Sequence, residues 1–348
     1  MKRFLPLFLL LSACATPRIS LPSAIAEPEV REIIGALASD GMEGRRAGTP
    51  GADKAAAYIA GRFRAAGLKA PGGDFLQGFT IDRKPKALPD ASAKMPAGQL
   101  YFLEQLNKQG AFTAHNVVGL VPGKSPDGRA VLVMAHYDHL GVCEPEGALD
   151  RICNGAVDNA SGVAALIAVA ERVAQMGLDR DVWFVATSGE EWGLLGAKAF
   201  AANPPVPLDS IIAGFNLDTI AIAPKGEPVA IVAADNSRLD LLVRDAAKAM
   251  GRPFDADKEA ASFLQRQDGW ALAQRGVPMI MAGGSFSDMK LLHAFLDSTY
   301  HGPKDELRPD TQLGGAVDDA NLHVEMVRRA ASRRLLPTFA AVPHLSTP

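Results

Sequence analysis

The stretch "AVLVMAHYDHLG", residues 130–141, decides the fold, because an uninterrupted apolar run passes directly into a polar segment. A short apolar run that ends in a polar turn is typical of a strand buried on both faces, as in parallel sheets. Open α/β sheets bind their ligands beyond the carboxyl ends of such strands. The stretch therefore predicts a buried strand that delivers His136 and Asp138 to a ligand-binding edge.

Further apolar runs of this kind alternate with segments of helical periodicity, in which apolar residues recur at spacings of three and four. Strands are predicted over residues 116–121, 130–135, 182–187, 210–217, 227–233 and 277–282. Helices are predicted over residues 30–39, 51–68, 161–176, 191–202, 238–250 and 316–336. The alternation predicts an α/β fold of three layers, αβα, with a mostly parallel mixed sheet between helices. Residues 70–110, rich in Pro and Gly, predict an irregular excursion.

The composition is that of a globular protein, and we expect one domain over residues 28–348. Of the 348 residues, 48% are apolar and 22% are charged, which is enough to bury a sizeable core. The net charge of −3 gives no general attraction to nucleic acid or to an acidic membrane surface. We therefore expect no nucleic-acid partner.

The N-terminus, "MKRFLPLFLLLSACATP", predicts an export signal over residues 1–13. A basic start precedes an apolar run that is too short to span a bilayer as a helix. Small residues before Cys14 resemble the bacterial lipoprotein signal, in which the cysteine is lipidated and begins the mature chain. A plain secretory signal is the alternative. The lipoprotein interpretation makes residues 14–27 a tether and places the protein on a bacterial membrane, facing the periplasm or the exterior.

Two further cysteines, Cys143 and Cys153, stand close together in the sequence. In an exported protein a disulfide between them persists, and closing the short segment would stabilise the fold by about 3 kcal/mol. The alternative is a pair of thiolate metal ligands. Their spacing matches no zinc-finger pattern, so the disulfide is the favoured interpretation.

Acidic residues and a histidine follow several of the predicted strands, and Asp158 lies in the turn before a predicted helix. They are His136, Asp138, Asp158, Glu190, Glu191 and Asp218. Carboxylates gathered at one edge cannot all stay ionised unless cations hold them, and imidazole with carboxylates suits Zn²⁺. A second histidine, His301, lies on a Gly/Pro loop late in the chain. Taken singly, these residues indicate a metal site only weakly. Asp158 could simply cap a helix, and paired glutamates are favoured at the start of any helix.

Five motifs together resemble family 28 of the metallopeptidases, the two-zinc aminopeptidases that include bacterial leucyl aminopeptidases. The motifs are "HYDHLG", "NGAVDNASG", "SGEEWGLLGAKAF", "FNLD" and "YHGPKDE". The segment "GRRAGTPGADKAAAYIAGRF" also looks like the opening of that family, so the resemblance covers nearly all of the mature chain. It implies a zinc aminopeptidase fold, two Zn²⁺ ions and peptide substrates.

The resemblance also implies roles for single residues. His136 and Asp218 resemble ligands of the first zinc, and Glu191 and His301 resemble ligands of the second. Asp158 resembles the carboxylate that bridges both ions. The remaining three would be Asp138 as the acid that orients the His136 ring, Glu190 as the general base and Tyr300 as a group that polarises the substrate carbonyl.

The chain departs from its relatives at Gln267-Asp268-Gly269, where many have Ser-Asp-His. This departure concerns the expected shape of the substrate site more than the chemistry. His139 lies in the first motif but matches no ligand, and hydrogen bonding is its expected role.

Three other functions stay open. A carboxypeptidase or an N-acyl amino acid amidohydrolase could use the same two-zinc scaffold, and a binding protein could keep the fold without catalysis. The complete ligand set disfavours the binding protein, and it also disfavours glutaminyl cyclisation, which typically uses one zinc.

Overall fold

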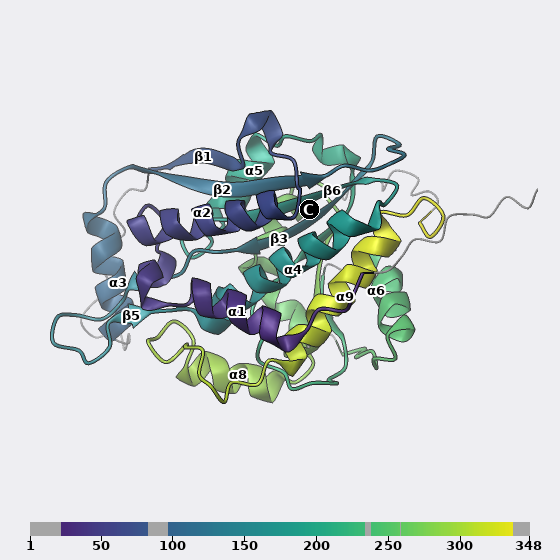
Figure 1. Cartoon of the computed structure of the whole chain (residues 1–348). Helices are drawn as coiled ribbons and strands as arrows, with labels where there is room; N and C mark the ends of the chain where they lie inside the picture. The colour runs from purple at the N-terminus through teal and green to yellow at the C-terminus, as the bar shows by residue number, and fades with distance from the viewer. Residues whose placement is uncertain (1–21, 83–96, 234–237, 258, 337–348) are drawn as a thin grey trace, which may run out of the picture.

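The computed structural model describes residues 22–82, 97–233, 238–257 and 259–336. Its centre is a seven-stranded sheet with the order β1-β2-β6-β3-β7-β9-β8. Figure 1 labels β1, β2, β6 and β3 of this sheet. The strands are β1 (Leu76–Ile81), β2 (Phe112–Val121), β3 (Ala130–His136), β6 (Asp181–Thr187), β7 (Ile211–Asn216), β8 (Ala230–Val232) and β9 (Met279–Gly283). The expected signal peptide and Cys14 lie outside the described residues.

The middle of the sheet is parallel and its edges are antiparallel. Strands β6, β3, β7 and β9 run in one direction, whereas β1, β2 and β8 run against their neighbours. Every residue of β3 is buried, as expected for a strand with helices over both faces. The predicted mixed α/β sheet is thus confirmed. The pairing also places β6 between β2 and β3, although β2 and β3 are consecutive in the chain.

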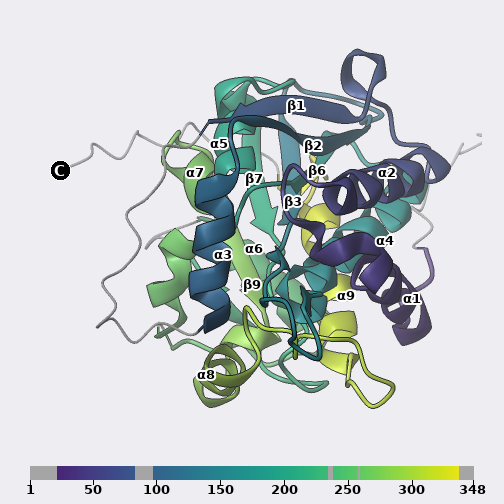
Figure 2. The same cartoon turned by 90° about the vertical axis from the view of Figure 1, so that its left-hand side faces the viewer.

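Helices form a layer on each face of the sheet (Figure 2). The larger layer comprises α1 (Glu27–Leu37), α2 (Pro50–Ala65), α4 (Ser161–Met176), α6 (Arg238–Ala249) and α9 (Gly314–Ala330). The opposite layer contains α5 (Leu195–Ala202) and α7 (Gly269–Ala273). Helix α4 is apolar around most of its circumference because it packs between the sheet and its helical neighbours α1 and α9.

The prediction that residues 70–110 are irregular was wrong in part. This segment contains the edge strand β1 and helix α3 (Ala97–Lys108). Among the described strands, β1 pairs with β2 alone. Its burial is mixed and its sequence includes Gly78, so the local sequence pattern gave little sign of a strand. Helix α8 (Met289–Ser298) was also not predicted; Asp288 caps it by accepting the Lys290 and Leu291 N–H groups.

Short turns complete the described chain. The 3₁₀ turns are Asp40–Arg45, Pro71–Gly73, Leu208–Ser210, Glu259–Arg266 and Gly284–Phe286, and a single π turn covers Ala156–Ala160. Among the described residues, none of the helices combines the length and the apolar character that a membrane span requires.

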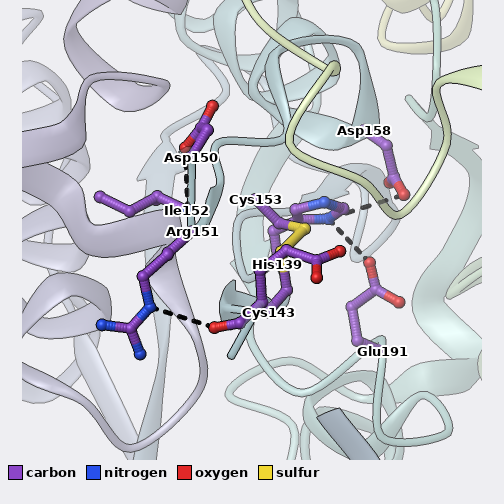
Figure 3. The surroundings of a disulfide bond; sticks show 9 residues. His139, Cys143, Asp150, Arg151, Ile152, Cys153, Asp158 and Glu191 are labelled. Atoms are coloured by element: carbon purple, nitrogen blue, oxygen red, sulfur yellow. Dashed lines mark hydrogen bonds and ion pairs between the residues drawn. A yellow bond between two sulfur atoms is a disulfide. The ribbon is translucent and has the colours of Figure 1, made fainter. Parts of the chain in front are cut away.

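A disulfide joins Cys143 to Cys153 and confirms the favoured pairing, with the two Cα atoms 5.8 Å apart. It closes a hairpin whose two short strands are β4 (Gly141–Val142) and β5 (Ile152–Cys153). Both cysteines are buried and pack against Leu140. Figure 3 shows that this bond lies beside His139, so the hairpin adjoins the polar edge of the sheet.

Candidate metal centre

Five of the predicted residues lie together near the carboxyl ends of the parallel strands. His136 is the last residue of β3, Asp218 lies just beyond β7, and Glu191 lies beyond β6. Asp158 precedes α4, and His301 comes from the loop after α8. Two groups of potential metal ligands result: His136, Asp158 and Asp218, and His139, Asp158, Glu191 and His301.

Asp158 belongs to both groups and offers a different oxygen to each. Its Oδ1 lies 3.2 Å from His136 Nε2, which is also 3.5 Å from Asp218 Oδ1. Its Oδ2 lies 3.3 Å from His301 Nε2, which is 2.9 Å from Glu191 Oε2. The arrangement therefore consists of two neighbouring sites that share one carboxylate.

The donor set suits cations. Asp158 Oδ2 and His301 Nε2 are buried and face each other, yet neither forms a hydrogen bond among the described residues. Although burial disfavours the charged imidazolium, Glu191 and Asp158 raise the pKa of His301 to about 10. The surroundings of His301 thus favour positive charge, and nitrogen with carboxylate oxygen is the ligand chemistry of zinc. The residues present fit a metal.

The local structure around Asp158 explains how it is held. Asp305 accepts the Val157 and Asp158 N–H groups at 2.8 and 3.0 Å, which links the His301 loop to the Asp158 segment. Asn159 donates to Leu217 O and accepts the Thr219 N–H, and these contacts tie the same segment to the end of β7. The ligand segments therefore support one another through buried hydrogen bonds.

Glu190 and Glu191 lie in a turn and not at the start of a helix as predicted. Residues 191–202 were expected to be helical, but α5 begins only at Leu195. Gly189, Gly193 and Leu194 have positive φ angles of 75°, 101° and 61°, which interrupt a helix and form a turn instead. Glu190 O accepts the N–H groups of Gly193 and Leu194 in that turn.

The His136 ring is oriented mainly by a main-chain group. Its Nδ1 donates to Asp138 O at 3.1 Å, whereas the Asp138 carboxylate Oδ1 is 3.8 Å away. This tautomer leaves the Nε2 lone pair toward Asp158 and Asp218. The Asp138 Oδ1 atom accepts the Glu190 N–H at 3.1 Å. Asp138 therefore connects the β3 end to the glutamate turn.

Glu190 lies outside both ligand groups of the described chain. Burial raises the pKa of its carboxyl well above the ordinary value. The charge of His136 opposes this rise, and the charge of Glu191 adds to it. Burial likewise raises the pKa of Asp138 to about 7. Such environments are common where a carboxylate must exchange protons near neutral pH.

Tyr300 is half-buried and stacks on the neighbouring His301 ring, with centroids 3.6 Å apart. Burial raises the pKa of its phenol well above the ordinary value, and Asp158 adds to the effect. The phenol therefore keeps its proton at neutral pH and can donate a hydrogen bond.

Gln267 and Asp268, where the chain departs from the resemblance, are buried near the end of β6. Asp268 Oδ2 accepts the Thr187 hydroxyl, and Gln267 Oε1 accepts the Gly269 N–H. This segment therefore borders the glutamate turn without joining either ligand group.

Three residues near the site were not predicted to belong to it. His139 joins the second ligand group, Arg45 donates to backbone carbonyls of two ligand segments, and Asp305 holds the Asp158 backbone. His139 lies in the motif "HYDHLG" and Asp305 in "YHGPKDE", so their places in these motifs could have indicated that they belong to the site. Arg45 stands in the opening segment, where nothing local distinguishes a buried arginine from an exposed one.

The comparisons with known proteins agree with this geometry. The model of peptidase family M28 matches residues 116–324, which is more than half of the chain. A zinc aminopeptidase from Bacillus subtilis has a similar fold, with a TM-score of 0.66 and 16% identity, over 90% of this chain and 97% of that one. A glutaminyl cyclase from Porphyromonas gingivalis is also similar, with a TM-score of 0.61 and 18% identity, over 87% and 96% of the two chains.

A curated relative matches over a shorter stretch. The alkaline phosphatase isozyme conversion protein of Escherichia coli K12 is 35% identical over 91 residues, which are 24% of this chain and 26% of that relative. The match thus spans about a quarter of the relative's length. The family match contains all the residues of both ligand groups, from His136 to His301. The chain belongs to peptidase family M28.

Proposed function

We propose that the protein is a zinc-dependent aminopeptidase that removes N-terminal residues from peptides. The observation that carries the proposal is the position of Asp158, whose two oxygens face different histidines. His136, Asp158 and Asp218 would hold one Zn²⁺, and Asp158, Glu191 and His301 would hold the other. When bound, two zinc ions supply an acidified water and positive charge for the developing oxyanion.

Glu190 is the proposed general base. It takes a proton from the attacking water and returns it to the leaving amine. Its half-buried position, its raised pKa and its place beside Glu191, a proposed ligand, support this role. Asp138 holds the turn by accepting the Glu190 N–H, which positions the carboxylate.

Tyr300 is the proposed partner of the substrate carbonyl. A phenol that stays protonated can donate to the carbonyl oxygen as negative charge develops there. Its stacking on His301 places it beside the second ligand group.

We further propose that the protein is exported and held on a bacterial membrane by a lipid on Cys14, facing the periplasm or the exterior. The sequence of the N-terminus supports this location, and the Cys143–Cys153 disulfide is compatible with an oxidising compartment.

The experiment is a substrate panel assayed with and without a chelator. It contains aminoacyl chromogenic amides, N-acyl amino acids, C-terminally cleavable peptides and peptides with N-terminal glutamine. We expect hydrolysis of the aminoacyl amides only, loss of activity with chelator and recovery with Zn²⁺. Preference for N-acyl or C-terminal substrates would contradict aminopeptidase activity, as would ammonia release from glutaminyl peptides without cleavage.

A further inference from the structure

The Glu191 carboxylate is contacted by a histidine at each of its oxygens. His301 Nε2 lies 2.9 Å from Oε2, and His139 Nδ1 lies 2.9 Å from Oε1. His139 is fully buried, and only 4% of the Glu191 side chain is exposed. The orientation of this carboxylate is therefore fixed from two sides.

The two histidines approach the acids differently. His301 Nε2 is close to both carboxylates, at 2.9 Å from Glu191 and 3.3 Å from Asp158. His139 Nδ1 is closer to Glu191, at 2.9 Å from Oε1, than to Asp158, whose Oδ2 is 3.7 Å away. An ionised carboxylate can only accept, so the short contact makes His139 Nδ1 a donor. His139 thus contacts the ligand, whereas His301 faces the space between the ligands.

The His139 ring is held in place by its surroundings. A Cβ atom at Gly155 would lie 2.6 Å from its Cγ atom, so the glycine backbone packs directly on the ring. The His301 ring meets it edge to face, with centroids 5.6 Å apart. Figure 3 shows His139 between the disulfide and the two carboxylates. The neighbouring Leu140 packs with both cysteines of the bridge, so the closed hairpin supports the ring.

We propose that His139 is a positioning residue of the second metal site. Its Nδ1–H holds Glu191 Oε1, so that Oε2 is presented toward the metal beside His301 and Asp158. The inference rests on the proposed two-zinc function and adds a residue to it. Hydrogen bonds of this kind orient metal-ligating carboxylates, and their loss typically weakens metal affinity about 10- to 100-fold.

The test is zinc titration into metal-stripped protein, with the number of bound ions and their affinities as the readout. We expect two ions in the wild-type protein and a second-site affinity about 10- to 100-fold weaker in His139→Leu. His139→Asn should stay within a few-fold of wild type, because its amide can donate from near the Nδ1 position. Asparagine is a poor zinc ligand, so this rescue separates positioning from ligation.

Buried His323 supplies the control, since it belongs to neither ligand group among the described residues. His323→Leu and His323→Asn should both keep wild-type zinc affinity. Thermal unfolding of the metal-free proteins checks their folding, and His139→Gln replaces His139→Leu if the latter does not fold. The longer side chain directs its amide away from the Nδ1 position, so it should lose affinity as well.

The outcomes separate the inference from the proposed function. Wild-type affinity at both sites in His139→Leu would overturn the positioning role alone. A His139→Asn variant as weak as His139→Leu would also overturn it, because a donor at the Nδ1 position would then not restore the affinity. A wild-type protein that binds fewer than two ions would overturn the two-zinc proposal and, with it, the inference.

Discussion

At the scale of single residues, adjacent Glu190 and Glu191 have different surroundings. Glu191 faces two histidines, and although burial opposes ionisation, His301 helps to lower its pKa to about 2. Burial instead raises the pKa of Glu190, which lies outside both ligand groups of the described residues. Two neighbouring acids in one turn can thus have different roles, one as a ligand and one as a base.

Replacing the base should separate metal binding from turnover. Glu190→Gln keeps the size of the side chain but cannot accept the proton, so we expect kcat to fall about 10²- to 10⁴-fold. Zinc content, measured on the same sample, should equal that of wild type, because Glu190 is not a proposed ligand. A variant with nearly full activity would remove Glu190 from the mechanism.

At the scale of elements, Arg45 joins segments that carry the ligands. Its buried guanidinium donates to the carbonyls of Leu37, Tyr137, Asn154 and Gly155 at 2.6 to 2.9 Å. Burial lowers its pKa to about 10, so it remains charged at neutral pH. One side chain therefore connects the end of α1 to the loop after β3 and to the loop that leads to Asp158.

Removing this guanidinium should destabilise the protein strongly. Arg45→Met leaves the four carbonyls buried without that donor, and each unsatisfied group costs about 1–3 kcal/mol. We expect the free energy of unfolding in urea to fall by about 4 kcal/mol or more, with a smaller loss for Arg45→Lys. Exposed Arg64 on α2 is the matched control, and Arg64→Met should change stability by less than about 1 kcal/mol. Equal effects at the two positions would contradict the role of Arg45.

Helix α9 carries a pH-dependent contribution to stability. His323 is fully buried with Nδ1 donating to Asp319 O, and burial lowers its pKa to about 4. The unfolded chain binds this proton near pH 6.5 and the folded chain only near pH 4, so stability falls as the pH drops through that window. The loss approaches about 3 kcal/mol. Chemical denaturation of His323→Leu should show a correspondingly weaker decline between pH 6.5 and 4, and an unchanged decline would refute the assignment.

At the scale of the whole molecule, the sequence predicted what depends on local pattern. Apolar runs predicted the buried strand β3 and the parallel centre of the sheet. The polar residues around these runs predicted the positions of His136, Asp158 and Asp218 at the sheet edge. Strand order was not predictable in this way, because the insertion of β6 between β2 and β3 depends on long-range pairing. The contact of His139 with Glu191 likewise joins residues far apart in the sequence, and so does the packing of Gly155 against the His139 ring.

The central claim concerns Asp158, whose two oxygens are proposed to serve both metal sites. The most direct measurement is the zinc content of Asp158→Asn beside wild type, determined after dialysis against a weak chelator. The asparagine amide provides one neutral acceptor oxygen in place of the two oxygens of a charged carboxylate, so both sites should bind zinc more weakly. The variant should keep at most one ion where wild type keeps two. Two tightly held ions in Asp158→Asn would contradict the shared-carboxylate site.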